Sequence, residues 1–410
     1  MFLIEKIKKS FFPFYRSSNA KKIFRILNSE NKIDAMFVGG CVRKFLLKEE
    51  IDDIDIATTL KPDEIIKKFE NSDVKVKKTG IEHGTLTLIM ENQKFEITTL
   101  RQDIATDGRH ANIKFSENWK EDSNRRDFTI NSIYMDRRGK IFDPQGGAQD
   151  LENNIIKFIG DPVKRIEEDF LRIVRFIRFS LQYNSKPNNL NLEAIKLNIN
   201  GIKKLSKERI LNELNKILAL KNFRNLIQEI ELKEIFLLIF PELKYLNRLE
   251  KSQFLISSNL SKDFILAILL IDDSDNYEYF CHKYKTSNLL QEKLRILRNL
   301  LKQAKIDKNF FTKDLKKNIF YHGKESIKSL AKLYFISHSK KNYLNLTNIL
   351  KEIDSINVPK FPITGKYLLD QGFKSGRKVG EALKKIEQQW VKNNFNLKDE
   401  ELKKLIKKNN

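Results

Sequence analysis

Two aspartates that alternate along a strand are the residues with the clearest chemical potential. Asp53 and Asp55 flank Ile54, in a stretch that predicts a β-strand over Asp53–Ala57. Because successive strand side chains point to opposite faces, both carboxylates should share one face while Ile54 points into the core. Two carboxylates on one rigid face suit a hard, oxygen-seeking cation such as Mg²⁺. An isolated Asp-x-Asp pair is more often a solvated turn, so its meaning depends on its neighbours.

A pair of glycines stands upstream of the aspartates, in the run Gly39-Gly40-Cys41-Val42-Arg43, and follows a short apolar strand expected over Ala35–Val38. Glycines let backbone N–H groups approach a phosphate chain closely, and Arg43 adds a fixed positive fork. Alone, the glycine pair would be an ordinary turn. Metal-binding carboxylates, a glycine turn and an arginine together indicate nucleotidyl transfer.

A third carboxylate, Glu96, lies in a strand expected over Lys94–Thr99, which pairs with Thr85–Met90 across a polar turn. Alternation places Glu96 and Thr98 on one face of this strand. If the strand neighbours the one that carries Asp53, Glu96 would reach the same metal ions. The alternative is an exposed strand glutamate.

Two arginines and an aspartate come next, in Arg125-Arg126-Asp127-Phe128-Thr129-Ile130-Asn131. The arginines can hold phosphates or sugar hydroxyls, and Asp127 can orient an arginine or accept a bond from a ribose hydroxyl. The alternative is an ordinary capped turn. The preceding stretch, Arg101–Asn124, is long and polar, which suggests a flexible loop at the active site or a merely exposed one.

Helical periodicity predicts one helix over Val163–Leu181, and this helix carries Asp169, Arg172 and Arg175. Residues at i and i+3 share a face, so Asp169 and Arg172 should lie side by side. Their acceptor and donor match the amino group and ring nitrogen on the edge of cytosine and adenine, and oppose uracil and guanine. The alternative is a surface salt bridge, which is common and weak.

The composition bounds the possible partners. The 410 residues contain 77 Lys and Arg against 54 Asp and Glu, giving a net charge of +23 that favours a polyanion such as RNA. Two cysteines cannot form a disulfide framework, which indicates a reducing, cytoplasmic compartment. No apolar run is long enough to span a membrane, and nothing indicates a stable protein partner.

The order of the elements predicts an α+β fold, with a small β-sheet head followed by a long helical part. We expect the head at 1–148, a helical neck at 149–225, a helical body at 226–350 and a helical tail at 351–410. In the neck, a helix capped by Ser206 is expected over Lys207–Leu220.

These motifs, in this order, resemble the class II CCA-adding tRNA nucleotidyltransferases, which share a family with bacterial poly(A) polymerases. The resemblance also covers Thr79–Thr85, Asp143–Gly147 and Lys207–Ile210, and it weakens beyond residue 225. Lys44 departs from it, standing where the family usually has Asp or Asn.

The resemblance implies a nucleotidyltransferase head and a reaction in which C, C and A are added to the acceptor end of tRNA. CTP and ATP would be the substrates, Mg²⁺ the cofactor, and protein rather than a nucleic-acid template would select the base. It implies that Asp53, Asp55 and Glu96 are catalytic and that the first two hold the metal. It assigns nucleotide binding to Gly39, Gly40, Arg43, Arg126, Asp127, Asn131, Asp169, Arg172 and Arg175.

Three other interpretations stay open from the sequence. The first is a poly(A) polymerase or an A-adding enzyme of the same family, although the retained length of Arg101–Asn124 favours full CCA addition. The second, from another class, is a non-catalytic RNA-binding protein, which the intact carboxylates and arginines oppose. The third is a small-molecule nucleotidyltransferase, which would not need a long basic helical half.

Overall fold

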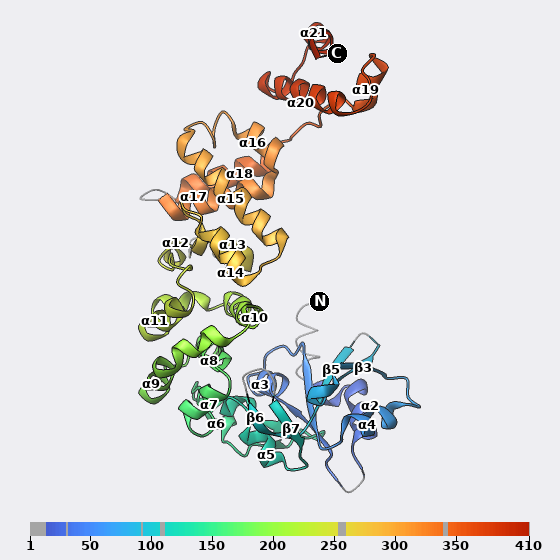
Figure 1. Cartoon of the computed structure of the whole chain (residues 1–410), viewed down its shortest axis with the longest axis vertical. Helices are drawn as coiled ribbons and strands as arrows, with labels where there is room; N and C mark the ends of the chain where they lie inside the picture. Colours follow the sequence, from blue (N-terminus) through green and yellow to red (C-terminus); the bar gives the residue numbers. More distant parts are fainter. Residues whose placement is uncertain are drawn as a thin grey trace. The chain divides into compact units, whose positions relative to one another are not determined.

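The chain divides into two compact units, with the boundary in the sequence between Pro241 and Glu242, and each is described by itself. The computed structural model describes residues 14–29, 32–91, 93–106, 111–252, 260–338 and 343–409. The first unit contains a β-sheet and helices, whereas the described part of the second is helical (Figure 1). This confirms the α+β class. The predicted division into head, neck, body and tail stays a prediction.

A mixed seven-stranded sheet forms the centre of the first unit, with the strand order β3-β4-β5-β2-β1-β8-β9. Its strands are β1 (Ala35–Val38), β2 (Ile54–Thr58), β3 (Lys75–Gly80), β4 (Thr85–Met90), β5 (Gln93–Thr99), β8 (Tyr134–Met135) and β9 (Ile141–Phe142). Strand β2 pairs in parallel with β5 and places Asp55 opposite Glu96. The β4–β5 hairpin and the neighbourhood of the two carboxylate strands are therefore confirmed, while the edge strand β3 was not predicted.

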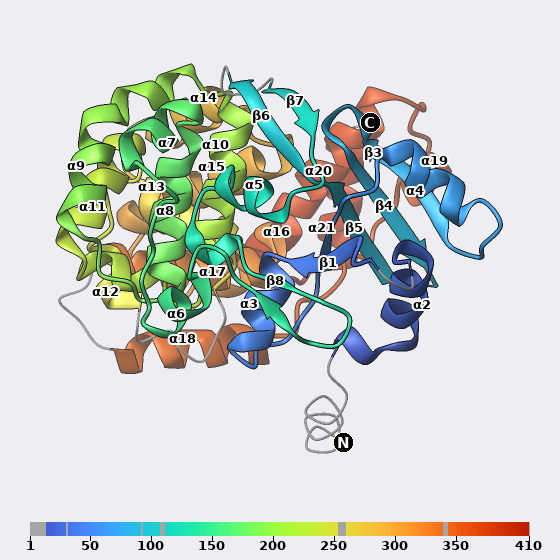
Figure 2. The same ribbon diagram turned by 90° about the horizontal axis from the view of Figure 1, so that it is seen from below.

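One face of the sheet is covered by helices and the other carries the carboxylates. Helices α2 (Ser18–Leu27) and α4 (Pro62–Phe69) contact each other (Figure 2). Phe24 of α2 packs on Phe37 of β1 at 4.3 Å between ring centroids. Phe37 lies opposite Ile56, so this is the face of Ile54 and Ile56. Asp55 points to the opposite face, as alternation predicts.

The stretch Arg101–Asn124 is ordered secondary structure where the structure describes it, and the expectation of a flexible loop was wrong there. It contains an antiparallel hairpin, β6 (Arg101–Thr106) with β7 (Ala111–Phe115), followed by α5 (Trp119–Asn124). The turn at residues 107–110 lies outside the described residues. Polar composition concealed the hairpin, because its two strands lack a continuous apolar alternation.

The helix expected over Val163–Leu181 is broken in two, as α7 (Pro162–Glu168) and α8 (Leu171–Gln182). Asp169 is extended, with φ −157° and ψ 103°, and its Oδ1 accepts the N–H of Leu171 at 3.1 Å. This bond to the backbone two residues on competes with the helical pattern, which is why periodicity alone missed the break. The other helices of this unit are α3 (Gly40–Leu46), α6 (Gly147–Glu152), α9 (Asn189–Asn198), α10 (Lys207–Leu218) and α11 (Ile230–Ile239).

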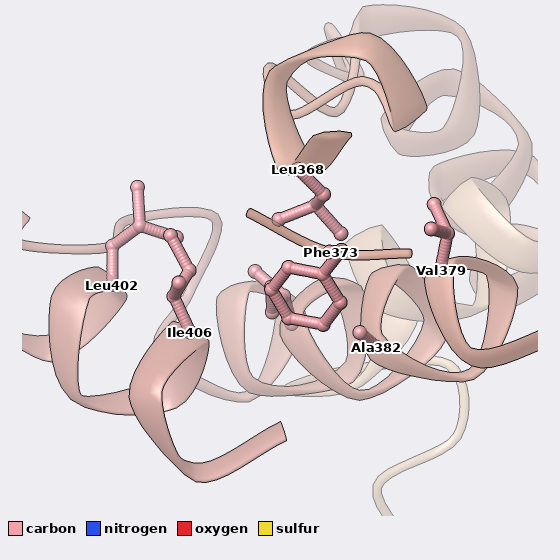
Figure 3. Packing of buried hydrophobic residues seen from close by; sticks show 7 residues of the cluster. Leu368, Phe373, Val379, Ala382, Leu402 and Ile406 are labelled. Carbon is pink, nitrogen blue, oxygen red and sulfur yellow. The ribbon is translucent and has the colours of Figure 1, made fainter. Parts of the chain in front are cut away.

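The second unit consists of helices packed around apolar cores. They are α12 (Arg248–Ser252), α13 (Lys262–Leu270), α14 (Asn276–Tyr284), α15 (Asn288–Ile306), α16 (Leu315–His322), α17 (Lys324–His338), α18 (Tyr343–Ser355), α19 (Gly365–Asp370), α20 (Arg377–Lys392) and α21 (Asp399–Asn409). The last three enclose a cluster of their own, in which Phe373 lies between Leu368 of α19 and Ala382 of α20, while α21 contributes Leu402 and Ile406 (Figure 3). Lysines remain on the outer surfaces, which agrees with the basic composition.

Candidate active site

A cleft of about 730 Å³ in the first unit collects nearly all the residues selected from the sequence. Among the charged residues that line it, ten are basic and six acidic. The predicted members are Gly39, Gly40, Arg43, Asp53, Asp55, Arg126, Asp127, Asn131, Asp169, Arg172 and Arg175. Glu96 does not line it. A polar cleft with a positive surplus and carboxylates is suited to a nucleoside triphosphate.

The glycine turn lies directly against the carboxylate of Asp55. Gly39 has a φ of +71°, which an L side chain adopts only with strain, and a Cβ there would stand 3.7 Å from Asp55 Oδ2. Burial raises the pKa of Asp55 to about 6, the negative charge of Glu96 adds to that effect, and Arg126 opposes it. A half-buried carboxylate that is costly to ionise gains most from a bound cation.

The carboxylates fit a magnesium ion that completes its shell with water and phosphate oxygens. Asp53 and Asp55 line the same cleft, although Asp53 is exposed and lies one residue before β2. The described residues contain no group of three or more acids, histidines or cysteines arranged to hold a metal. Mg²⁺ is commonly held by one or two carboxylates plus substrate phosphates, so the pair suffices. Metal binding and the part assigned to Glu96 stay predictions.

A buried aspartate that the motifs did not single out holds both arginines of the next motif. The carboxylate of Asp122 is fully buried and accepts from Arg125 Nε at 2.8 Å, Arg126 Nη2 at 3.0 Å and the Tyr134 hydroxyl at 2.7 Å. Burial by itself opposes ionisation, but the two guanidinium groups outweigh it and hold the pKa of Asp122 below its ordinary value. Asp122 therefore fixes the direction in which Arg126 faces the cleft. Its spacing of three and four residues from the arginines was the available sequence signal.

Asp127 is the centre of a second network, which combines both interpretations given to it. Its Oδ1 accepts from the backbone N–H of Phe128 at 2.9 Å and from Asn131 Nδ2 at 2.6 Å, and its Oδ2 accepts from Arg175 Nε at 2.6 Å. Burial opposes its ionisation, but Arg175 and the hydrogen bond from Asn131 together outweigh burial and hold the pKa of Asp127 low. Asp127 thus caps a turn and orients an arginine, and a contact with ribose stays a prediction.

Arg43 extends this network toward the glycine turn. Its guanidinium donates to the Asn131 side chain and, through Nε, to the Tyr183 hydroxyl at 3.0 Å. The arginine is buried except for the part that lines the cleft. Arg43 therefore links α3 both to Asn131 and to Tyr183 at the end of α8, and it also faces the cleft.

Asp169 and Arg172 both line the cleft, but they do not form the side-by-side pair that one continuous helix would produce. Asp169 Oδ2 accepts from Arg209 Nη2 at 2.7 Å. Arg172 Nη1 donates to the carbonyl of Arg165 at 2.6 Å and also pairs with Glu168. The break in the helix directs the two side chains to these separate partners. Reading of the base by Asp169 and Arg172 stays a prediction.

Sequence reasoning also missed a further arginine of α8. Arg178 stands on α8 one turn beyond Arg175, and its Nε donates to Glu213 Oε2 at 2.7 Å. The Arg178 guanidinium lies 4.0 Å from the centre of the Phe179 ring, in cation–π contact. The spacing of Arg172, Arg175 and Arg178 at three-residue intervals was a signal for a basic helix face.

Three family models match the chain in succession. Residues 35–157 match the poly A polymerase head domain, 191–246 the probable RNA and SrmB-binding site of polymerase A, and 258–406 the putative tRNA nucleotidyltransferase domain 2. CCA tRNA nucleotidyltransferase 1, mitochondrial, of Homo sapiens is 30% identical over 98% of this chain and 93% of its own. The chain belongs to the family of CCA-adding tRNA nucleotidyltransferases and poly(A) polymerases. A CCA-adding enzyme of Lactobacillus helveticus is likewise 30% identical, over 86% of this chain and 88% of its own.

Solved structures of family members share the fold. The CCA-adding enzyme of Bacillus stearothermophilus in complex with CTP superimposes with a TM-score of 0.71 at 24% identity, over 92% of each chain. The Thermotoga maritima CCA-adding enzyme complexed with tRNA_CCA gives 0.64 at 18% identity, over 98% of each chain. In the part of the chain that the structure describes, no helix is long and apolar enough to cross a membrane. Because the human relative is named as mitochondrial, the cytoplasmic compartment stays a prediction.

Proposed function

We propose that this nucleotidyltransferase adds C, C and A to the 3′ end of tRNA from CTP and ATP, without a nucleic-acid template. One observation carries the proposal: a single cleft holds the carboxylates Asp53 and Asp55, the Gly39 turn, and the polar face of the neck. Reactive and selective groups therefore face the same space. The names of the curated relatives support CCA addition over other products of this family.

Different residues of the cleft would bind the metal ion and the triphosphate. Asp53 and Asp55 would hold Mg²⁺, which supplies Lewis-acid activation of the 3′-hydroxyl and charge neutralisation at the departing pyrophosphate when it is bound. The Gly39-Gly40 turn and Arg126 would bind the triphosphate, with Arg126 held in direction by Asp122. Because these groups are fixed before the reaction, little reorganisation is required when charge develops.

The neck would select the base. Asp169 offers an acceptor and Arg172 a donor, which cytosine and adenine satisfy and which uracil and guanine leave unpaired at a cost of about 1–3 kcal/mol. In the structure Asp169 is held by Arg209 and Arg172 by Glu168. An ionised carboxylate offers about four acceptor sites and a guanidinium five donors, so both side chains can contact a base while these protein partners hold them in position.

Extension of a tRNA that lacks its last three nucleotides tests the proposal. CTP alone should add two residues, CTP with ATP three, and UTP or GTP none. Addition of one A to a CC-ended tRNA with no addition to the shorter tRNA would indicate an A-adding enzyme. A long tail from ATP would indicate a poly(A) polymerase, and no addition to either tRNA would indicate an RNA-binding protein. Asp53→Ala and Asp55→Ala should both abolish addition while RNA binding is retained.

The base-reading step has its own test, the kcat/KM of all four nucleotides. Asp169→Ala should lose discrimination against UTP and GTP by roughly tenfold to a hundredfold, more than it loses nucleotide binding. Glu167→Ala is the matched control, since Glu167 is an exposed acid of α7 that does not line the cleft. Unchanged selectivity in Asp169→Ala would mean that the pair with Arg209 is purely structural.

A further inference from the structure

The carboxylate face of the sheet continues beyond the cleft across three further strands. Strand pairing places Asp55 opposite Glu96, Glu96 opposite Thr87, and Thr87 opposite Lys77, which forms one row from β2 to the edge strand β3. A second row joins Lys94, Ile89 and Lys75. Cross-strand partners share a face, so both rows lie on the side of the sheet to which Asp55 points.

This face of β3, β4 and β5 is open to solvent. Lys75, Lys77, Lys94 and Glu96 are exposed, and the threonines and Ile89 between them are half-buried. On the opposite face of β4 and β5, by contrast, the apolar side chains are buried: Leu86, Leu88, Met90, Phe95 and Ile97. Within the described residues, no ion pair is found for the three lysines. The open face thus presents positive charge without an ion-pair partner, beside threonine hydroxyls that pair with one another, Thr87 with Thr79 and Thr85 with Thr98.

The cleft lies on the other side of Asp55 from this open face. The cleft is lined by α3 with its glycine turn, the Asp52–Asp55 segment, the Arg126 motif, Arg101 of β6 and residues within 168–216, and by no residue of β3, β4 or β5. In phosphoryl transfer the attacking and leaving oxygens stand roughly in line on opposite sides of the phosphorus. If the triphosphate occupies the cleft, the attacking 3′-hydroxyl has to approach from the side of β5.

We propose that the open face of β3, β4 and β5 binds the RNA strand that precedes the reacting 3′-hydroxyl. The phosphates of that strand would lie on Lys75, Lys77 and Lys94. This inference rests on the proposed function, because it presumes an RNA acceptor at Asp55.

The order of chemical groups along the row agrees with that occupant. Glu96 is next to Asp55, where a hydroxyl and no phosphate of the acceptor would stand. Thr87 follows, and its hydroxyl, which lies 2.9 Å from that of Thr79, can donate to a phosphate or sugar oxygen while it accepts from Thr79. Lys77 ends the row about 14 Å from Asp55, three strand spacings away. The carboxylates of the row would therefore repel a negatively charged polymer only near its reacting 3′ end.

The test replaces the three lysines and compares a control triple variant. Lys75→Ala/Lys77→Ala/Lys94→Ala should raise the KM for a CC-ended tRNA about tenfold and leave the KM for ATP unchanged. Its log–log plot of RNA affinity against salt should be shallower by about 2, since about 0.7 is lost for each single-strand phosphate contact. The control is Lys21→Ala/Lys67→Ala/Lys68→Ala, which removes the same charge from exposed positions on α2 and α4, the helices over the opposite face.

Equal effects in the two triple variants would overturn the proposal, because only net charge would then matter. Self-association of the first variant with unchanged RNA affinity would also overturn the proposal. The lysines of the edge strand β3 would then act to prevent strand pairing between molecules, and not to bind RNA. RNA affinity is measured without nucleotide as well. If the wild-type chain extends no tRNA but its RNA affinity depends on the three lysines, the proposed function fails while the surface is retained.

Discussion

Replacing Asp55 by asparagine should make the metal-free protein more stable while it abolishes catalysis. Burial and Glu96 raise the pKa of Asp55 from its ordinary 3.8 to about 6. At pH 8 the carboxylate is ionised in both the folded and the unfolded chain. The difference between its pKa values in the two states then corresponds to a free energy of about 3 kcal/mol against folding. Asparagine has nearly the same shape and carries no charge, so it removes this cost.

The sign of the pH dependence follows from the raised pKa. Between about pH 4 and 6 the folded protein binds more protons at Asp55 than the unfolded chain does, so its free energy of unfolding falls as the pH rises through this range. Asp55→Asn lacks this pH-dependent contribution to the free energy of unfolding. The advantage of the variant over the wild type should therefore be absent near pH 4 and complete above pH 7.

Denaturant unfolding in EDTA provides the measurement. Trp119 packs against Tyr134 at 5.5 Å, within the apolar cluster of the first unit, so its fluorescence in a Trp390→Phe background reports that unit alone. Adding Mg²⁺ should stabilise the wild type and not Asp55→Asn. Asp53→Asn is the control, and it should gain little because Asp53 is exposed. If Asp55→Asn were less stable than the wild type at pH 8 in EDTA, the reasoning would be refuted.

Four further outcomes are expected. Asp122→Asn should lower kcat/KM about a hundredfold and the free energy of unfolding by about 3 kcal/mol, since it leaves buried arginines without a counter-charge. Arg209→Met should weaken discrimination against UTP and GTP without changing the KM for tRNA, because Asp169 loses its holder. Asp127→Ala should reduce the preference for CTP over dCTP, and equal preference in wild type and variant would make Asp127 a structural cap. Affinity for tRNA should fall steeply between about 50 and 200 mM salt, whereas a flat plot would mean that the net charge of +23 has no part in binding.

Local sequence patterns predicted several features of the first unit correctly. The alternation of Phe95, Glu96 and Ile97 predicted which of them is buried, because one face of a strand packs on the core. Ser206 before α10 predicted where that helix begins, since caps act within a few residues. Motif spacing together with the family resemblance selected half of the residues that line the cleft.

Other features depended on contacts that periodicity does not record. The helix over Val163–Leu181 had the right apolar spacing throughout, yet the side chain of Asp169 bonds to the backbone and interrupts it. The hairpin over Arg101–Phe115 has no apolar alternation, and pairing between its strands defines it. Local sequence cannot weigh such bonds against helix or loop, because their energies are of similar size.

The sequence by itself determined the α+β class, the carboxylate pair and the order of the motifs, because these depend on spacing along one strand or one helix. Only the tertiary structure decided which partners the charged groups take. It places Asp122 beneath the arginines, assigns Asp169 to Arg209, and sets Glu96 in register with Asp55. Those choices join residues 40 or more positions apart, or depend on burial, and burial is a property of the packed chain.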